Sequence, residues 1–225
     1  MRRLNVLSFF LVATISVFLS QTASAAEDVA SILAKIDAAG ARTRTISAEL
    51  EWKTVQSEPV PDEEVQVGSI FFKRDRDDSF EMAAHIRTVN GKSVPKILTY
   101  AHGTATLYEK LPNEFHTFKA GDKETQFNSI LLLGFGVNRY DLTKNFDLRL
   151  IRSEILNGIN CDVLELTPKD EKTRERLVSV IIWFDVARGL GIKQVFDEGG
   201  GMHRECLYTE IKINSHLPLD AFRQR

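Results

Sequence analysis

The sequence predicts a mainly β protein with helical segments (β+α): a strongly curved, unclosed antiparallel barrel of about eleven strands, with a helix at its start and a helical insertion in its middle. Three observations predict this fold. Most of the chain repeats apolar residues with a period of two. Turn residues separate these runs at short intervals. Some runs, such as SIFF at 69–72, are apolar on both faces, so both faces of the sheet must be covered.

Residues 1–25 have the pattern of a secretory signal peptide. Two arginines follow the initiating methionine, an apolar run comes next, and Ala-Ser-Ala at 23–25 supplies small residues for cleavage. No cysteine lies near this point to carry a lipid anchor, and no later segment is long enough for a membrane span. We therefore expect an exported product, residues 26–225, that forms a single domain.

The composition argues against two classes of protein. Without residues 1–25 the chain has 27 Lys and Arg against 31 Asp and Glu, a formal charge of −4. A nucleic-acid-binding protein normally has a basic surface, so we expect no nucleic-acid partner. The full chain is 43% hydrophobic, which is enough for a large core and argues against disorder.

The first element of the mature chain is an amphipathic helix over 28–40. Its apolar residues at 29, 32, 33 and 36 form one stripe, and Gly40 is expected to end it.

Six strands follow the helix. Asn90-Gly91 and His102-Gly103 are expected to form tight turns between neighbouring strands. The predicted strands are TISAELEWKTVQ, VQVGSIFFKR, SFEMAAHIRT, PKILTYA, ATLYEK and EFHTFKA.

The period of two is interrupted by a helical insertion at 121–136. Phe127, Ile130 and Leu131 fall on one helical face, and Gly134 is expected to end the helix. Five further strands then complete the sheet. They are DLRLIRSEIL, CDVLELTP, LVSVIIWFDV, GIKQVFD and HRECLYTEIKI.

No catalytic constellation stands out in the sequence. It has no nucleophile elbow, zinc-protease motif, phosphate-binding loop or dinucleotide fingerprint, and its five histidines are scattered. We expect a protein that is not an enzyme and that uses neither a metal nor a cofactor. Cys161 and Cys206 could pair in an oxidising compartment, but each lies in a different predicted strand, so the sequence leaves their disulfide open.

Several of these segments, in this order, resemble the LolA-type periplasmic carriers of outer-membrane lipoproteins. ISAELEWK is similar to the opening strand of that family, VGSIFFKR to its strand with a Lys-Arg pair, and ILLLG to its central helix. VLELTPK and IIWFDVARGLGIKQVFDEGGG are similar to its C-terminal hairpins, and IKINSHLPLDAF to its ending. The resemblance implies a periplasmic lipoprotein carrier, a half-barrel whose helical lid closes an apolar cavity for acyl chains.

Arg74 is the residue that the resemblance singles out. The period of two places it on the same face as Ile70 and Phe72, where a guanidinium must find acceptors. The resemblance implies that Arg74 latches the lid through hydrogen bonds to lid backbone, although Asp75 replaces the family's proline. The alternative is a strand-end arginine that reaches water and the acidic residues at 75, 77 and 78.

The same face supplies the candidate lipid-binding residues. Each of them could equally be an ordinary core residue. The sheet candidates are Trp52, Ile70, Phe72, Phe80 and Met82, and the lid candidates that would meet them are Phe127, Ile130 and Leu131.

Partners and alternatives follow from the resemblance. It implies acylated lipoproteins as cargo, an inner-membrane ABC-type releasing complex as donor and an outer-membrane acceptor, and we expect a monomer. A carrier of another envelope lipid, such as a phospholipid or glycolipid, would have the same sequence pattern. A lipid-sensing regulatory module on the same fold is the other alternative. Such modules usually carry a second C-terminal domain, and an ending at Arg225 disfavours that interpretation.

Overall fold

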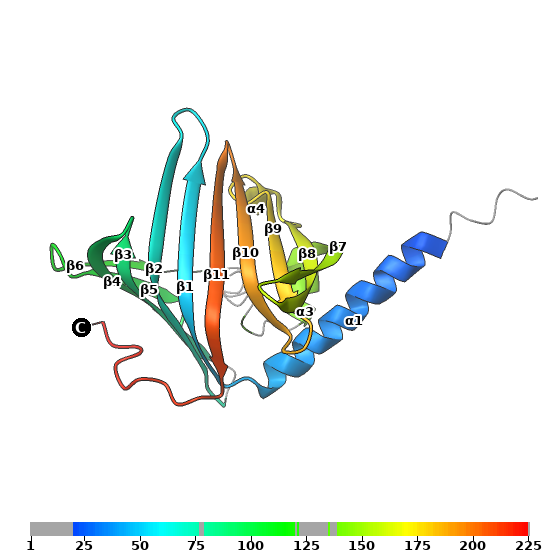
Figure 1. Ribbon diagram of the computed structural model, residues 1–225, viewed down its shortest axis with the longest axis horizontal. Coiled ribbons are helices and arrows are strands. Elements are labelled where there is room, and N and C mark those ends of the chain that lie inside the picture. The colour runs from blue at the N-terminus through cyan, green and yellow to red at the C-terminus, as the bar shows by residue number, and fades with distance from the viewer. Residues whose placement is uncertain (1–19, 77–78, 120, 122–134, 136–138, 225) are drawn as a thin grey trace, which may run out of the picture.

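The computed structural model describes residues 20–76, 79–119, 121, 135 and 139–224 (Figure 1). The eleven predicted strands are all present and form one antiparallel sheet. The strands are β1 (Thr45–Gln56), β2 (Asp62–Arg74), β3 (Phe80–Val89), β4 (Lys92–Ala101), β5 (Thr104–Glu109), β6 (Glu114–Lys119), β7 (Phe146–Leu156), β8 (Ile159–Pro168), β9 (Ser179–Asp185), β10 (Leu190–Gly199) and β11 (Met202–Ile213). The described helices are α1 (Ser20–Arg42), α3 (Arg139–Asn145) and α4 (Glu171–Arg174).

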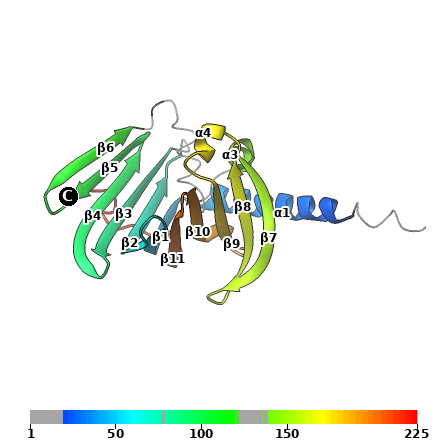
Figure 2. The ribbon, with the colours of Figure 1, turned by 90° about the horizontal axis from the view of Figure 1, so that it is seen from above.

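The sheet is curved and does not close. Its strand order is β6-β5-β4-β3-β2-β1-β11-β10-β9-β8-β7, so β6 and β7, which follow each other in sequence, form the two edges. Figure 2 shows the strands from above as an arc. The pairing of β1 with β11 joins the two halves of the sheet at its centre. The predicted fold class is confirmed.

Tight turns set the register of the hairpins. Asn90-Gly91 and His102-Gly103 have positive φ at both residues, from 47° to 74°, as predicted for two-residue hairpin turns. Gly68, inside β2, has a different reason to lack a side chain. A Cβ there would lie 2.2 Å from the carbonyl oxygen of His85 on β3, at a shift in the register of the two strands.

Two apolar clusters share the concave side of the sheet, which we call the inner face. We name the first the β2–β3 cluster; it comprises Ile46, Ala48, Leu50, Ile70, Phe72, Phe80, Met82, Ala84, Ile86, Tyr100, Phe135, Leu190, Cys206 and Tyr208. We name the second the α1 cluster; it comprises Ile32, Leu33, Ile36, Leu142, Phe146, Leu164, Leu166, Leu177, Val180, Ile182 and Phe184.

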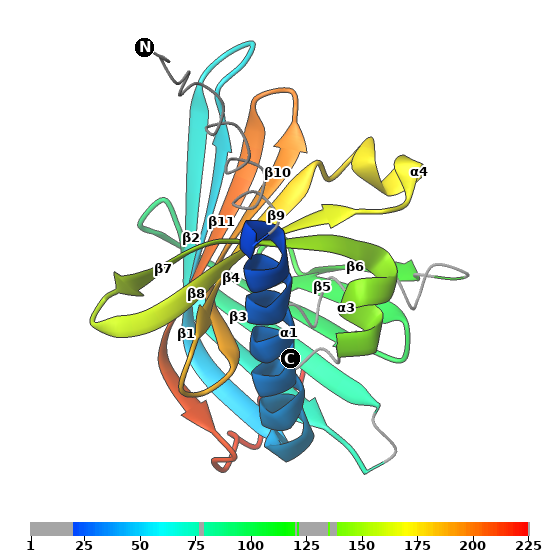
Figure 3. The same cartoon turned by 90° about the vertical axis from the view of Figure 1, so that its right-hand side faces the viewer.

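Helix α1 covers the inner face over one half of the sheet (Figure 3). Its predicted apolar stripe, Ile32, Leu33 and Ile36, packs into the α1 cluster, and no described residue of α1 belongs to the β2–β3 cluster. The helix ends at Arg42, two residues beyond the predicted stop at Gly40. Side chains of Thr43, Arg74 and Asn214 donate to the carbonyl oxygens at 39, 40 and 42, so no glycine in a left-handed conformation is needed there.

The C-terminal tail covers part of the opposite, outer face. In Figure 1 the tail runs back from β11 toward the β4 side of the sheet. Ala221 is 1% exposed, and its carbonyl oxygen lies 2.9 Å from Nε2 of His85. Gln224 donates a hydrogen bond from Nε2 to Oγ1 of Thr99 on β4. This explains why β2 to β4 are apolar on both faces. Among the described helices, none is long and apolar enough to cross a membrane.

Candidate functional site

The β2–β3 cluster contains the sheet residues that the sequence predicted as one face. Ile70 and Phe72 come from β2, Phe80 and Met82 from β3, and Trp52 of β1 packs against the cluster while remaining partly exposed. Antiparallel pairing sets Phe72 directly opposite Met82. The predicted alternation of these strands is therefore confirmed in space.

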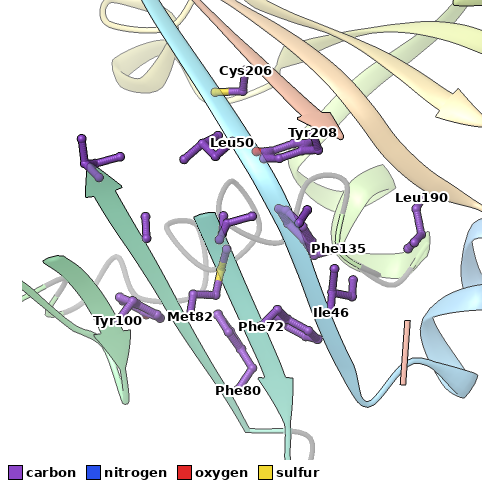
Figure 4. Close-up of a cluster of buried hydrophobic side chains, with 14 residues drawn as sticks. Ile46, Leu50, Phe72, Phe80, Met82, Tyr100, Phe135, Leu190, Cys206 and Tyr208 are labelled. Atoms are coloured by element: carbon purple, nitrogen blue, oxygen red, sulfur yellow. The ribbon is translucent and has the colours of Figure 1, made fainter. Parts of the chain in front are cut away.

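Aromatic rings form the centre of this cluster (Figure 4). Phe72 is fully buried, and its ring centroid lies 6.0 Å from that of Phe80 and 6.2 Å from that of Phe135. Phe135 meets Tyr208 of β11 edge to face at 4.9 Å, and Phe80 lies 5.4 Å from Tyr100 of β4. These contacts link β2, β3 and β4 directly, and Phe135 links β2 to β11.

The cover over the two clusters differs. The α1 cluster includes residues of α1 and α3, whereas every member of the β2–β3 cluster except Phe135 belongs to a strand. Phe127, Ile130 and Leu131, the lid residues predicted to meet this face, lie outside the described residues. Within the described chain, the β2–β3 cluster is thus the part of the inner face that α1 leaves uncovered.

Arg74 lies at the end of β2, between the cluster and α1. Its Nη1 donates a hydrogen bond to the carbonyl oxygen of Gly40 at 3.3 Å, and its guanidinium carbon lies 5.5 Å from the centre of the Phe72 ring. The predicted placement of Arg74 beside Phe72 is confirmed. The contact with Gly40 pairs a cation with the C-terminal end of a helix, where carbonyls lack partners within the helix.

Cys161 and Cys206 are both buried and both free, so the disulfide that the sequence left open is not formed. Strands β9 and β10 separate β8 from β11, which puts the two cysteines at least about 14 Å apart across three strand spacings. A disulfide needs Cα atoms within about 7 Å. Burial raises the pKa of the Cys206 thiol to about 12 and also raises the pKa of Cys161, so both stay protonated and unreactive.

One polar group on the inner face was not singled out from the sequence. Arg204 of β11 lies on the same face as Cys206 and Tyr208, and its guanidinium carbon is 5.6 Å from the centre of the Trp52 ring. It forms an ion pair with Glu198 of β10. The period of two in HRECLYTE, at 203–210, is the signal that could have identified it.

A separate hollow of about 320 Å³ lies at the ends of β9, β10 and β11. Ile181 and Val195, which line it, alternate with the inner-face residues of their strands, so this hollow belongs to the outer face. It is therefore distinct from the β2–β3 cluster. In the described part of the chain, no group of three or more His, Cys, Asp or Glu residues is placed to hold a metal ion.

Solved structures with the same architecture are similar to this one at low sequence identity. MucB matches with a TM-score of 0.54 and 14% identity, over 88% of this chain and 62% of MucB. The complex of MucA and MucB from Pseudomonas aeruginosa matches with a TM-score of 0.51 and 14% identity, over 87% of this chain and 60% of that chain. LprF from Mycobacterium bovis matches with a TM-score of 0.50 and 11% identity, over 88% and 99%.

These similarities show the fold, and the predicted unclosed half-barrel is confirmed at that level. A LolA superfamily protein from Nitrosomonas europaea also matches, at a TM-score of 0.40 and 14% identity over 86% of this chain and 96% of that one, which is too weak to support any inference. This chain spans less than two thirds of MucB. No protein-family model matches the sequence, and no curated protein matches it significantly.

Proposed function

We propose that this protein is a lipid carrier of the cell envelope, which shields the acyl chains of lipoproteins against the β2–β3 cluster. The observation that supports this most is the uneven cover of the inner face. Helix α1 packs on one half of a curved, unclosed sheet. The other half carries a buried apolar cluster in which, among the described residues, Phe135 alone comes from outside the strands.

The energetics of such a face suit a carrier. Burial of acyl chains yields about 0.8 kcal/mol per methylene, so a single long chain supplies on the order of 10 kcal/mol gross. A carrier must return most of this when it releases its cargo, which requires contacts that the lipid breaks on entry. The contact of Arg74 with Gly40 is of this kind.

The sequence also bears on where the protein acts and with which partners. The predicted signal peptide at 1–25 directs the chain to the periplasm, where we propose that it collects lipoproteins from an ABC-type releasing complex of the inner membrane and delivers them to an outer-membrane acceptor. Another acylated envelope lipid would occupy the same face. The function needs no catalytic group, and we propose that the protein is not an enzyme.

The two tryptophans allow a direct test. Trp52 packs against the β2–β3 cluster on the inner face, and Trp183 lies on the outer face, where Nε1 donates to Glu154. Bromine atoms on an acyl chain quench tryptophan fluorescence on contact. A brominated lipid should quench the Trp183→Phe variant, which retains Trp52, and should leave the Trp52→Phe variant unquenched.

The same lipid without bromine is the control for indirect changes in fluorescence. Equal quenching of the two variants would show that the lipid does not prefer the inner face, and the proposal would fail. Absence of quenching in both variants, with no lipid bound, would refute a carrier function outright.

A lipid-sensing regulatory module is the second candidate, because MucB, whose structure has also been solved with MucA, shares the fold. A sensor retains its lipid and changes its affinity for a protein partner, whereas a carrier passes the lipid on. Transfer of lipid from the loaded protein to acceptor vesicles separates the two functions: a carrier unloads and a sensor does not.

A further inference from the structure

Arg204 is a charged residue on an apolar face. Binding of acyl chains does not explain why a charge lies there. Arg204 faces Phe196 of β10 and Thr54 of β1, near the hairpin tips of the sheet. Phe196 packs against both inner-face clusters. Arg204 thus extends the inner face at the end remote from Phe72.

The guanidinium is only partly satisfied where it lies. Its terminal nitrogen Nη2 pairs with Glu198, but Nε is buried and has no hydrogen-bond partner within the described chain. Burial lowers the pKa of Arg204, because the cation has lost part of its hydration. The side chain remains 37% exposed and Glu198 19% exposed, so a molecule entering from this end could reach both.

An ion pair here is poorly explained by stability. Removing two charges from water costs free energy that their mutual attraction often fails to return, and apolar residues would pack as well on this face. The neighbouring positions are also polar: Gln66, opposite Trp52, donates from Nε2 to Glu64, and Gln194, opposite Cys206, is buried. One end of the inner face is therefore polar and the other apolar. A lipid molecule is divided in the same way, into a polar headgroup and apolar acyl chains.

We propose that Arg204 binds the acidic headgroup of the bound lipid, a phosphate or carboxylate, which replaces Glu198 as the partner of the guanidinium. This inference rests on the proposed carrier function and favours its alternative cargo, an acidic envelope lipid, because the acylated cysteine of a lipoprotein carries neither group. The headgroup would lie near the ring of Trp52, and the acyl chains would run along β1 toward Ile46, which is paired with Phe72. The nine residues from Thr54 to Ile46 span roughly 26 Å, a length suited to a long acyl chain.

The test is a competition between two lipids with identical chains. The protein is incubated with vesicles of equimolar phosphatidylglycerol and diacylglycerol, and native mass spectrometry counts the protein loaded with each. The wild type should prefer phosphatidylglycerol about tenfold, since a charge-assisted hydrogen bond contributes more than a neutral one. Arg204→Gln should remove the preference and keep diacylglycerol uptake, and Glu198→Gln should enlarge the preference.

Arg149→Gln is the matched control. Arg149 also pairs with a carboxylate, that of Glu165, but it alternates with the inner-face residue Leu148 and its side chain is 66% exposed on the outer face. Its loss should leave the lipid ratio unchanged. Glu198→Gln keeps the test decisive if Arg204→Gln fails to fold, because an unchanged ratio in that variant overturns the inference.

The other outcomes separate this inference from the function it rests on. Equal loading of both lipids by the wild type overturns the headgroup site and leaves the carrier standing. Loading of neither lipid overturns both. Inorganic phosphate alone should not abolish the preference; if it does at millimolar concentration, the site binds free phosphate and the lipid assignment is wrong.

Discussion

At the scale of single residues, the inner face raises the question of which side chains are core and which would contact cargo. Phe72 is fully buried against the rings of Phe80 and Phe135, whereas Trp52 packs against the cluster and stays partly exposed. Burial of this degree predicts a structural role for Phe72 and a contact role for Trp52.

Substitution with alanine should separate these roles. Phe72→Ala should lower the free energy of unfolding by about 3 kcal/mol or more, because it leaves a cavity in a packed aromatic group. Trp52→Ala should cost clearly less and should reduce lipid uptake. Urea denaturation and a lipid-binding assay measure the two effects, and a larger stability loss at Trp52 than at Phe72 would contradict the assignment.

Arg74 is expected to affect release of cargo. In Arg74→Leu, the hydrogen bond to Gly40 and the contact with Phe72 are lost, so the lipid-free arrangement is less favoured and bound lipid is retained. A net contribution of about 1.4 kcal/mol would slow transfer to acceptor vesicles roughly tenfold. Arg74→Lys, which keeps the charge, should restore part of the rate. Unchanged transfer by Arg74→Leu would show that Arg74 has no part in release.

Cys206 predicts a loss of stability at alkaline pH. Its pKa is raised from an ordinary 9.0 to about 12, so the folded state keeps a proton that the unfolded chain loses. The stabilisation is complete below pH 9 and disappears as the pH rises toward 12, by up to about 1.4 kcal/mol per pH unit. Burial raises the pKa of Tyr208 in the same direction. Urea unfolding as a function of pH should show this decline, and Cys206→Ala should make it shallower. Equal slopes of unfolding free energy against pH in the wild type and the variant would contradict a role of Cys206.

The residue scale also shows what the sequence could and could not predict. Period two sufficed for Ile70, Phe72 and Arg74, because β2 keeps its alternation through these positions. It applied equally to Arg204, but its partner Glu198 lies next to a register shift in a glycine-rich tip, and no local pattern predicts that pairing. The Arg74 contact with Gly40 is likewise a tertiary one, 34 residues apart in sequence.

At the scale of elements, the eleven strands were predictable because turns and alternation are local. The pairing of β1 with β11 was not predictable, since it joins residues about 150 positions apart in sequence at the centre of the sheet. The cover of the outer face by the C-terminal tail was also not predictable, because IKINSHLPLDAF has no regular period. The apolar outer side of β2 to β4 indicated only that some cover must exist.

Gly68 tests the packing of β2 against β3. A methyl group there would lie 2.2 Å from the His85 carbonyl, so Gly68→Ala must push the two strands apart. We expect a loss of about 2 kcal/mol in the free energy of unfolding, measured by urea denaturation. An unchanged unfolding midpoint would mean that the strands do not approach this closely.

Ala221 tests the docking of the tail. Ala221→Asp would bury a carboxylate at a site built for a methyl group. We expect a loss of at least about 2 kcal/mol in the free energy of unfolding. Leu219→Asp introduces the same side chain two residues away, where Leu219 is 88% exposed, and should have little effect. Equal effects of the two substitutions on the melting temperature would contradict a docked tail.

At the scale of the whole molecule, the protein combines a half-barrel, a helix that covers half of its inner face and an apolar cluster with one polar end. The fold itself does not determine function, because the same architecture serves different proteins. What distinguishes a carrier from a protein with a filled core is whether the β2–β3 cluster opens to admit an acyl chain.

Native mass spectrometry of the protein purified from the periplasm, followed by identification of anything bound, measures this most directly. We predict an acylated molecule bound to a fraction of the protein, and reloading of the stripped protein when lipid is added. A protein that carries nothing and takes up no lipid would have a filled core at the β2–β3 cluster, and the carrier function would be refuted.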